Sequence, residues 1–211
     1  MPTGDRLLTF ALTAFVVIAI PGPSVLFIVG RALSTGRRAA LLTVLGNTVG
    51  EYCQVLAVAF GIGALVEQSV TAFTAVKFAG AAYLVYLGIK TFGDRRSLPA
   101  LLEATSTVVD RWPALRGGIV GLTNPKTVVF LAAILPQFVN RSAGDVPLQI
   151  LMLGLVFSSI ALVSDSVWAL GAHAFRSWFA RSPRRLELVG GAGGLAIVAV
   201  GVGVAFTGRK D

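Results

Sequence analysis

The chain has 211 residues, of which 55% are hydrophobic and only 13% are charged, and its mean hydropathy is +0.80. A soluble domain of this length carries about twice that share of charged residues, so the composition excludes a soluble enzyme, a disordered chain and a disulfide-rich scaffold. The net charge of +8 is therefore expected in the cytoplasmic loops of a membrane protein rather than on a nucleic-acid interface.

Six stretches of the chain are long enough for a membrane helix, which needs about 20 mainly apolar residues. In chain order they are residues 7–30, 39–66, 68–89, 117–140, 146–175 and 188–208. The sequence therefore predicts an all-α integral membrane protein with six transmembrane helices, joined by short connections and one longer, polar central loop.

Two of these spans, the first and the fourth, are interrupted by proline, and the interruptions are the predicted substrate site. The residues concerned are Pro21, Gly22, Pro23 and Ser24 in the first span and Asn124, Pro125 and Lys126 in the fourth. Proline lacks the backbone donor of a regular helix, and in lipid such a break survives only against protein or a water-filled cavity. The half-helices that begin near Ser24 and Pro125 expose free N–H groups, which favour an anion such as a carboxylate. The alternative is that both breaks are simple kinks that shape helix packing.

Charged side chains inside the predicted spans are the second indication of a site, because each costs about 2.5–3.5 kcal/mol at the membrane centre. Glu51 and Asp165 lie deep within the second and fifth spans, where a carboxyl group can bind and release a proton, so we predict that they couple transport to protons. Asn47 lies one helical turn before Glu51 and extends the polar site, although it could instead bond a neighbouring helix. Lys126 is expected to bind the substrate carboxylate, whereas Lys77 lies close to a span edge and is expected to extend toward the membrane surface. Alternatively, the buried charges form an ion pair that only orders the bundle.

Each group of three spans has the same order of features: a broken helix, a helix with one carboxylate and a helix rich in small residues. Because three is an odd number, the two groups must have opposite orientations in the membrane, which is the inverted repeat of many secondary transporters. The predicted organisation is a first repeat at residues 1–93, a cytoplasmic connecting loop at 94–113 and a second repeat at 114–211.

The distribution of basic residues predicts the orientation. Twelve of the 18 Lys and Arg residues fall in connections on one side, with Arg31 counted as the first of them, and five fall on the side of the termini. Basic residues favour cytoplasmic loops, so the side with twelve is expected to be cytoplasmic and both termini are expected to be outside.

Short motifs along almost the whole chain carry a family resemblance. They are Pro21-Gly22-Pro23, Gly30-Arg31, Gly36-Arg37-Arg38, Gly46, Gly50, Phe78-Ala79-Gly80-Ala81-Ala82-Tyr83-Leu84, Gly88, Gly118, Asn124-Pro125-Lys126 and Pro136-Gln137-Phe138. In this order and spacing the chain resembles the lysine exporter and homoserine/threonine resistance (LysE/RhtB) family of bacterial amino-acid exporters. The resemblance implies a multi-pass protein of the bacterial inner membrane that exports amino acids or related metabolites, driven by an ion gradient without ATP. It does not identify the substrate, because family members handle basic, hydroxylated and branched amino acids.

The leading hypothesis is a secondary transporter that exports an amino acid or a close derivative from the cytoplasm by proton antiport. Its partners would be the substrate and the lipid bilayer, with no cofactor, metal, nucleic acid or catalytic residue, and dimerisation is plausible because six short helices enclose little volume. The alternatives are an exporter of another solute, such as a metal ion or a peptide-like toxin, and a membrane-embedded enzyme or assembly subunit. Export of a metal ion has weak support, because the candidate ligands are spread over different helices. An enzyme has weak support as well, because no clustered nucleophile and base stands out.

Overall fold

The computed structural model of the chain describes residues 4–62, 70–97, 111–180 and 183–206. Within these ranges the chain forms helices and short connections, without a β-strand. The main helices are α1 (Gly4–Ala19), α2 (Pro23–Ser34), α3 (Arg37–Ala57), α5 (Val70–Gly93), α7 (Pro113–Leu122), α8 (Pro125–Val129), α9 (Val146–Ala180) and α10 (Pro183–Phe206). The shorter elements are the π-helices η1 (Val58–Ile62) and η3 (Phe130–Ile134) and the 3-10 helices η2 (Asp94–Ser97), η4 (Leu135–Phe138) and η5 (Arg141–Ala143). The predicted all-α class is confirmed.

Both predicted proline breaks are present in the structure. The helix axis turns by 55° between α1 and α2, and by 42° between α7 and the helical segment Pro125–Phe138. In a regular α-helix each N–H donates to the carbonyl four residues earlier, and proline has no N–H. Pro21 therefore deprives the carbonyl of Val17 of its helical donor, and Pro125 does the same to the carbonyl of Gly121.

By length and composition, two helices of the described residues are candidate membrane spans, Arg37–Gly61 and Val146–Ala172, and the number rises to four if each bent pair is one span. The third and sixth predicted spans correspond to α5 and α10, which have 24 residues each, or about 36 Å of helix. In α10 the described apolar part is Gly191–Phe206. The count of six spans, the inverted repeat and the three-part division of the chain remain predictions.

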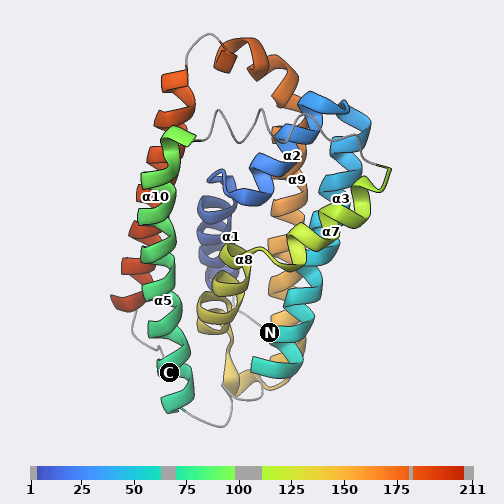
Figure 1. Cartoon of the computed structure of the whole chain (residues 1–211). Helices are drawn as coiled ribbons and strands as arrows, with labels where there is room; N and C mark the ends of the chain where they lie inside the picture. Colours follow the sequence, from blue (N-terminus) through green and yellow to red (C-terminus); the bar gives the residue numbers. More distant parts are fainter. Residues whose placement is uncertain (1–3, 63–69, 98–110, 181–182, 207–211) are drawn as a thin grey trace.

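Three of the four segments of the broken helices lie between two groups of packed helices (Figure 1). On one side α5 and α10 pack along each other, and on the other side α3 packs against α7 and α9. The segments α1, α2 and α8 lie between these groups, so both breaks face the interior. The beginning of α1 and the end of α10 are directed toward one end of the molecule, and the α2–α3 connection lies at the opposite end.

Glycines allow α3 and α7 to approach to backbone contact. A Cβ atom added at Gly46 would lie 2.7 Å from the carbonyl carbon of Ala114, and one added at Gly117 would lie 2.9 Å from that of Thr43. These distances are too short for any side chain, so only glycine fits at this separation. Small residues have this role in many membrane helix pairs, and here they hold Asn47 and Glu51 of α3 next to the break that follows α7.

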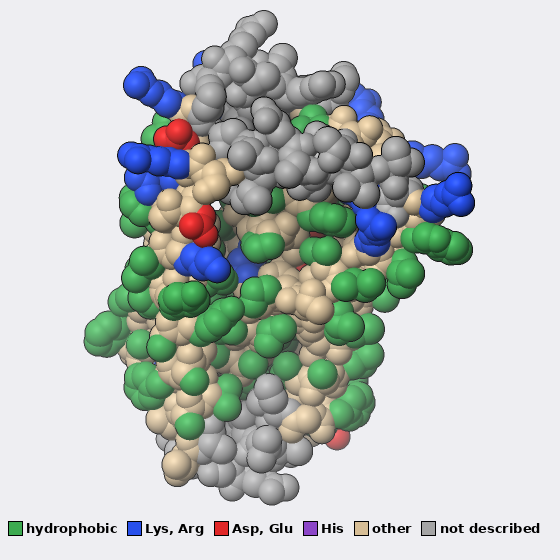
Figure 2. All heavy atoms as spheres, viewed as in Figure 1, with side chains coloured by type: hydrophobic (Ala, Val, Ile, Leu, Met, Phe, Trp, Pro, Cys, Tyr) green, Lys and Arg blue, Asp and Glu red, His purple; other side chains and the backbone are tan. Residues whose placement is uncertain are grey.

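On the face shown in Figure 2, hydrophobic side chains are spread over the middle, and Lys and Arg side chains gather around the end that holds the α2–α3 connection. The exposed side chains include Phe60 at 69% and Val49 at 64% of their full accessibility. An apolar belt with basic residues at one end is the surface expected of a protein that spans a bilayer.

One basic residue, Arg31, lies elsewhere than predicted. Arg31 belongs to α2 rather than to a connection and is only 1% exposed, because α2 continues to Ser34 and ends before Gly36, whose φ is +89°. Its guanidinium lies 5.3 Å from the ring centroid of Phe27. Lys77 is 9% exposed, and its extension toward the membrane surface remains a prediction. The first charge after an apolar run is therefore a poor marker of where these helices end.

Candidate functional site

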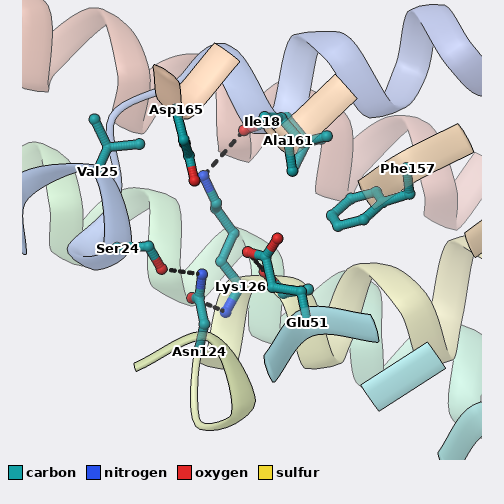
Figure 3. Close-up of a pocket in the computed structure, with 11 residues that line it drawn as sticks. Ile18, Ser24, Val25, Glu51, Asn124, Lys126, Phe157, Ala161 and Asp165 are labelled. Atoms are coloured by element: carbon teal, nitrogen blue, oxygen red, sulfur yellow. Dashed lines mark hydrogen bonds between the residues drawn. The ribbon is translucent and has the colours of Figure 1, made fainter. Parts of the chain in front are cut away.

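The two proline breaks meet in the centre of the molecule. Asn124 Nδ2 donates to Ser24 Oγ at 2.6 Å, which links the start of α8 to the first turn of α2. Asn124 Oδ1 accepts the backbone N–H of Lys126 at 3.1 Å and so caps α8, as expected for asparagine before a proline at the first helical position. One side chain therefore shapes one break and contacts the other (Figure 3).

The Lys126 side chain crosses from α8 to the end of α1. Its Nζ donates to the carbonyl oxygen of Val17 at 3.0 Å and to that of Ile20 at 2.9 Å. A Cβ atom added at Gly22 would lie 3.2 Å from this Nζ, so the missing side chain of Gly22 leaves room for the ammonium group. In this conformation Lys126 thus contacts the carbonyls freed by the first break.

The predicted acids come from two further helices and reach the same place. Glu51 Oε1 of α3 accepts from Thr127 Oγ1 at 3.2 Å, and Asp165 Oδ2 of α9 accepts from Asn47 Nδ2 at 3.1 Å. The charges of Glu51, Lys126 and Asp165 interact with one another, and each of the three side chains is at most 5% exposed. The structure therefore brings together the charged groups of the second, fourth and fifth predicted spans.

A small cavity lies among these groups. Five of its lining residues were predicted as site residues, namely Ser24, Glu51, Asn124, Lys126 and Asp165. The others are Val17, Ile18, Val25, Thr127, Phe157 and Ala161. The cavity measures about 10 Å³, counted as the space open to the centre of a water-sized sphere, which is room for about one water molecule. A space of this size does not hold an amino acid.

The other predicted site residues surround the cavity without lining it. Asn47 is 1% exposed and reaches the site through its bond to Asp165. Pro21, Pro23 and Pro125 act through the backbone, because they create the breaks from which the polar side chains project.

Two hydrophobic clusters of buried side chains lie on either side of the acids along α3 and α9. In the first cluster, Phe130 stacks on Phe157 with ring centroids 5.2 Å apart and lies 6.0 Å from Phe10. The second cluster contains Ile28 of α2 and Val44 of α3 together with residues of α9. The acids thus occupy the position between two apolar clusters.

The structure adds Thr127, Gln54 and Phe157 to the predicted site. Gln54 Nε2 donates to the carbonyl oxygens of Gly121 at 2.8 Å and Leu122 at 2.7 Å, so it caps the carbonyls at the second break. Sequence signals existed for all three: Thr127 follows Lys126, Gln54 is a polar residue one turn after Glu51, and Phe157 lies two turns before Asp165 on the same face.

Within the described parts of the chain, no group of three or more His, Cys, Asp or Glu side chains is placed to hold a metal ion. The predicted proton-coupling and substrate roles of the polar residues remain predictions.

The chain is similar to known proteins over most of its length. The family model "LysE type translocator" matches residues 15–208. The chain belongs to the LysE family.

An uncharacterized membrane protein of Vibrio cholerae is 40% identical to this LysE-family chain over 178 residues, covering 83% of the chain and 84% of that protein. The homoserine/homoserine lactone efflux protein of Salmonella typhimurium is 30% identical over 193 residues, covering 91% and 92%. The leucine efflux protein of Enterobacter sp. is 26% identical over 187 residues, covering 86% of each chain. No solved structure gives a significant match to the chain.

Proposed function

We propose that this LysE-family protein is a secondary transporter that exports an amino acid or a close derivative from the cytoplasm by proton antiport. Membership of a translocator family and the efflux proteins among its relatives support export. The observation that carries the proposal is the meeting of two helix breaks around a small polar cavity with two buried acids. Matched breaks are where secondary transporters bind their substrates.

Two buried acceptors support an exchange of proton for substrate. Glu51 Oε2 and Asn47 Oδ1 have no hydrogen-bond partner among the described residues, and a buried acceptor without a donor costs about 1–3 kcal/mol. A proton on Glu51 or the ammonium group of an amino acid would supply the missing donor. Antiport needs a site that accepts either cation but not both together, so we assign the exchange to Glu51 and Asp165.

The other end of the substrate fits the breaks. The first turn of α2 offers backbone N–H groups, and Ser24 and Asn124 lie beside it with polar side chains. Helix N-termini stabilise a carboxylate. We therefore assign the substrate carboxylate to this side and its ammonium to the side of Glu51 and Asp165.

Helix packing supports the inverted repeat that alternating access would use. In the proposed repeats α3 corresponds to α9 and α5 to α10, and each of these pairs is in contact. The contact of α3 with α7 has its counterpart in the contact of α9 with α1. Rocking one repeat against the other would separate one of the two hydrophobic clusters and keep the other closed. A ligand drives this motion only if it binds the two open states differently.

The surface supports the predicted orientation in the bacterial inner membrane. Basic side chains gather at the end that holds the α2–α3 connection (Figure 2), and basic residues favour the cytoplasm. The beginning of α1 and the end of α10 are directed to the opposite end, so we propose that both termini are outside. The homodimer remains a prediction.

The test is uphill export by intact and substituted protein. A strain that expresses the chain is grown on a panel of toxic amino acids and analogues, with intracellular pools measured, and the active substrate is then used in proteoliposomes with an imposed pH gradient. We expect Glu51→Gln and Asp165→Asn to abolish gradient-driven transport, because neither amide can carry the proton. Asp145→Asn is the matched control, since Asp145 is an exposed acid outside the site.

The outcomes separate the parts of the proposal. Counterflow without a gradient that survives in Glu51→Gln would identify a coupling residue rather than a structural one. Gradient-driven export equal to that of the intact protein in both substituted proteins would contradict proton coupling through these acids. Failure to lower any amino-acid pool would count against the exporter itself.

A further inference from the structure

The end of α1 carries backbone acceptors that its own helix cannot satisfy. The carbonyl of Val17 would accept from residue 21, which is a proline without an N–H. The carbonyl of Ile20 would accept from Ser24, but the chain turns by 55° at this break, and Ile20 lies beyond the last residue of α1. These two oxygens point at one position, because a single atom, Lys126 Nζ, lies 3.0 Å from one and 2.9 Å from the other.

That position is electrically suited to a cation. A helix C-terminus carries a partial negative charge, and the two acids that face Lys126, Glu51 from α3 and Asp165 from α9, attract it further. Carbonyls of interrupted helices coordinate coupling cations in many secondary transporters. Here the ammonium of Lys126 occupies the place, and Gly22 leaves the space for it.

The second break shows that a neutral donor is enough to cap such carbonyls. There the oxygens of Gly121 and Leu122 accept from the uncharged amide of Gln54 at 2.8 and 2.7 Å. A lysine at the first break therefore does more than satisfy hydrogen bonds. Its positive charge is costly to bury, but it balances the negative charges of Glu51 and Asp165. A neutral glutamine could not do so.

We propose that the carbonyls of Val17 and Ile20, together with the nearby acids, form a monovalent-cation site and that the Lys126 ammonium is its built-in occupant. The ligand class is a small monovalent cation, either a metal ion or a primary ammonium. With lysine in place the site needs no free cation. Without it, a free cation of suitable size would bind. The inference concerns binding at this position and does not depend on which substrate is exported.

The test measures thermal unfolding of purified Lys126→Ala protein in detergent, by tryptophan fluorescence. The protein is titrated with NaCl, KCl or methylammonium chloride, with choline chloride as the control for ionic strength. We expect at least one small cation to raise the Tm of Lys126→Ala by about 3 °C or more at about ten times its dissociation constant. Choline should not act, because it is too large and has no N–H group. Lys126→Met, which keeps an apolar stem, replaces the alanine variant if that protein does not fold.

Two further proteins make the result decisive. The intact protein should show no cation-specific rise in Tm. Neither should Lys77→Ala, a control that loses another buried lysine. Lys126→Gln should have a lower Tm than the intact protein, because an amide supplies hydrogen bonds but no charge.

The proposal is overturned if neither Lys126→Ala nor Lys126→Met responds to any small cation, or if the controls respond equally. It is also overturned if Lys126→Gln is as stable as the intact protein, since Lys126 would then be only a cap. None of these measurements requires transport, so a failure here is separate from a failure of the exporter proposal.

Discussion

The contact between α3 and α7 gives a prediction in which two adjacent glycines behave differently. A Cβ atom added at Gly117 would lie 2.9 Å from the carbonyl carbon and 3.0 Å from the Cα of Thr43. One added at Gly118 would meet, among the described residues, only the carbonyl oxygen of Gly46, at an ordinary 3.5 Å. We predict that Gly117→Ala destabilises the protein relative to Gly118→Ala.

The size of the difference follows from these distances. The carbonyl oxygen of Thr43 would lie closer still to the added Cβ, and an ordinary contact is at least 3.4 Å. The backbones at Thr43 and Gly117 must therefore separate by about an ångström or more, and such overpacking costs about 1–3 kcal/mol. Both variants gain about 1 kcal/mol of helix propensity from alanine, which cancels in the comparison. For a protein of this size 1 kcal/mol shifts the Tm by about 2–4 °C, so Gly117→Ala should melt about 2–12 °C below Gly118→Ala.

The assay is thermal unfolding of both purified proteins in one detergent, followed by tryptophan fluorescence. The separation of α3 from α7 should also weaken the bond from Thr127 to Glu51, already 3.2 Å long, so export should fall further in Gly117→Ala than in Gly118→Ala. Equal melting temperatures would refute the reasoning, because the two helices would then not be held at backbone contact.

Three further predictions test the breaks and the orientation. Gln54→Leu removes the amide donor of the Leu122 carbonyl and should cost about 1–3 kcal/mol, measured as a lower Tm. Asn124→Ala removes the cap of α8 and the bond to Ser24 and should cost about 1–2 kcal/mol, whereas Asn124→Asp keeps the cap acceptor and should recover part of the loss. A reporter enzyme that is active only in the cytoplasm should be inactive when fused after Asp211, and activity there would contradict the orientation.

The features that follow from local chemistry could be predicted from the sequence. Pro21 and Pro125 interrupt their helices because each removes a backbone donor, and no distant residue can restore it. Glu51 and Asp165 stand out in an apolar background, because a charge within a span needs partners or a cavity. The order of these features indicated that the breaks and the acids belong to one site, and the structure brings them together.

The pairing of side chains could not be predicted, because it depends on how the helices pack. Asn47 lies on the same face of α3 as Glu51, yet its amide donates to Asp165 of α9. Lys126 was expected to wait for a substrate carboxylate, but its side chain reaches carbonyls more than a hundred positions earlier in the chain. Local spacing determines which residues share a face, and only the packed bundle determines which partner lies within reach.

The position of the acids along their helices connects packing with transport. In both α3 and α9 the acid lies on a stripe of buried residues whose two ends are apolar. The stripe on α3 is Ala40, Val44, Asn47, Glu51 and Val55, and the stripe on α9 is Val146, Ile150, Leu153, Phe157, Ala161, Asp165, Ala169 and Ala172. The apolar side chains can close either end of the site. They do not, however, distinguish a bound proton from a bound substrate. A ligand shifts the balance between two open states only through groups that distinguish it from its competitor. On these two stripes the groups with that capacity are Glu51, Asp165 and Asn47, which lie where the two hydrophobic clusters meet.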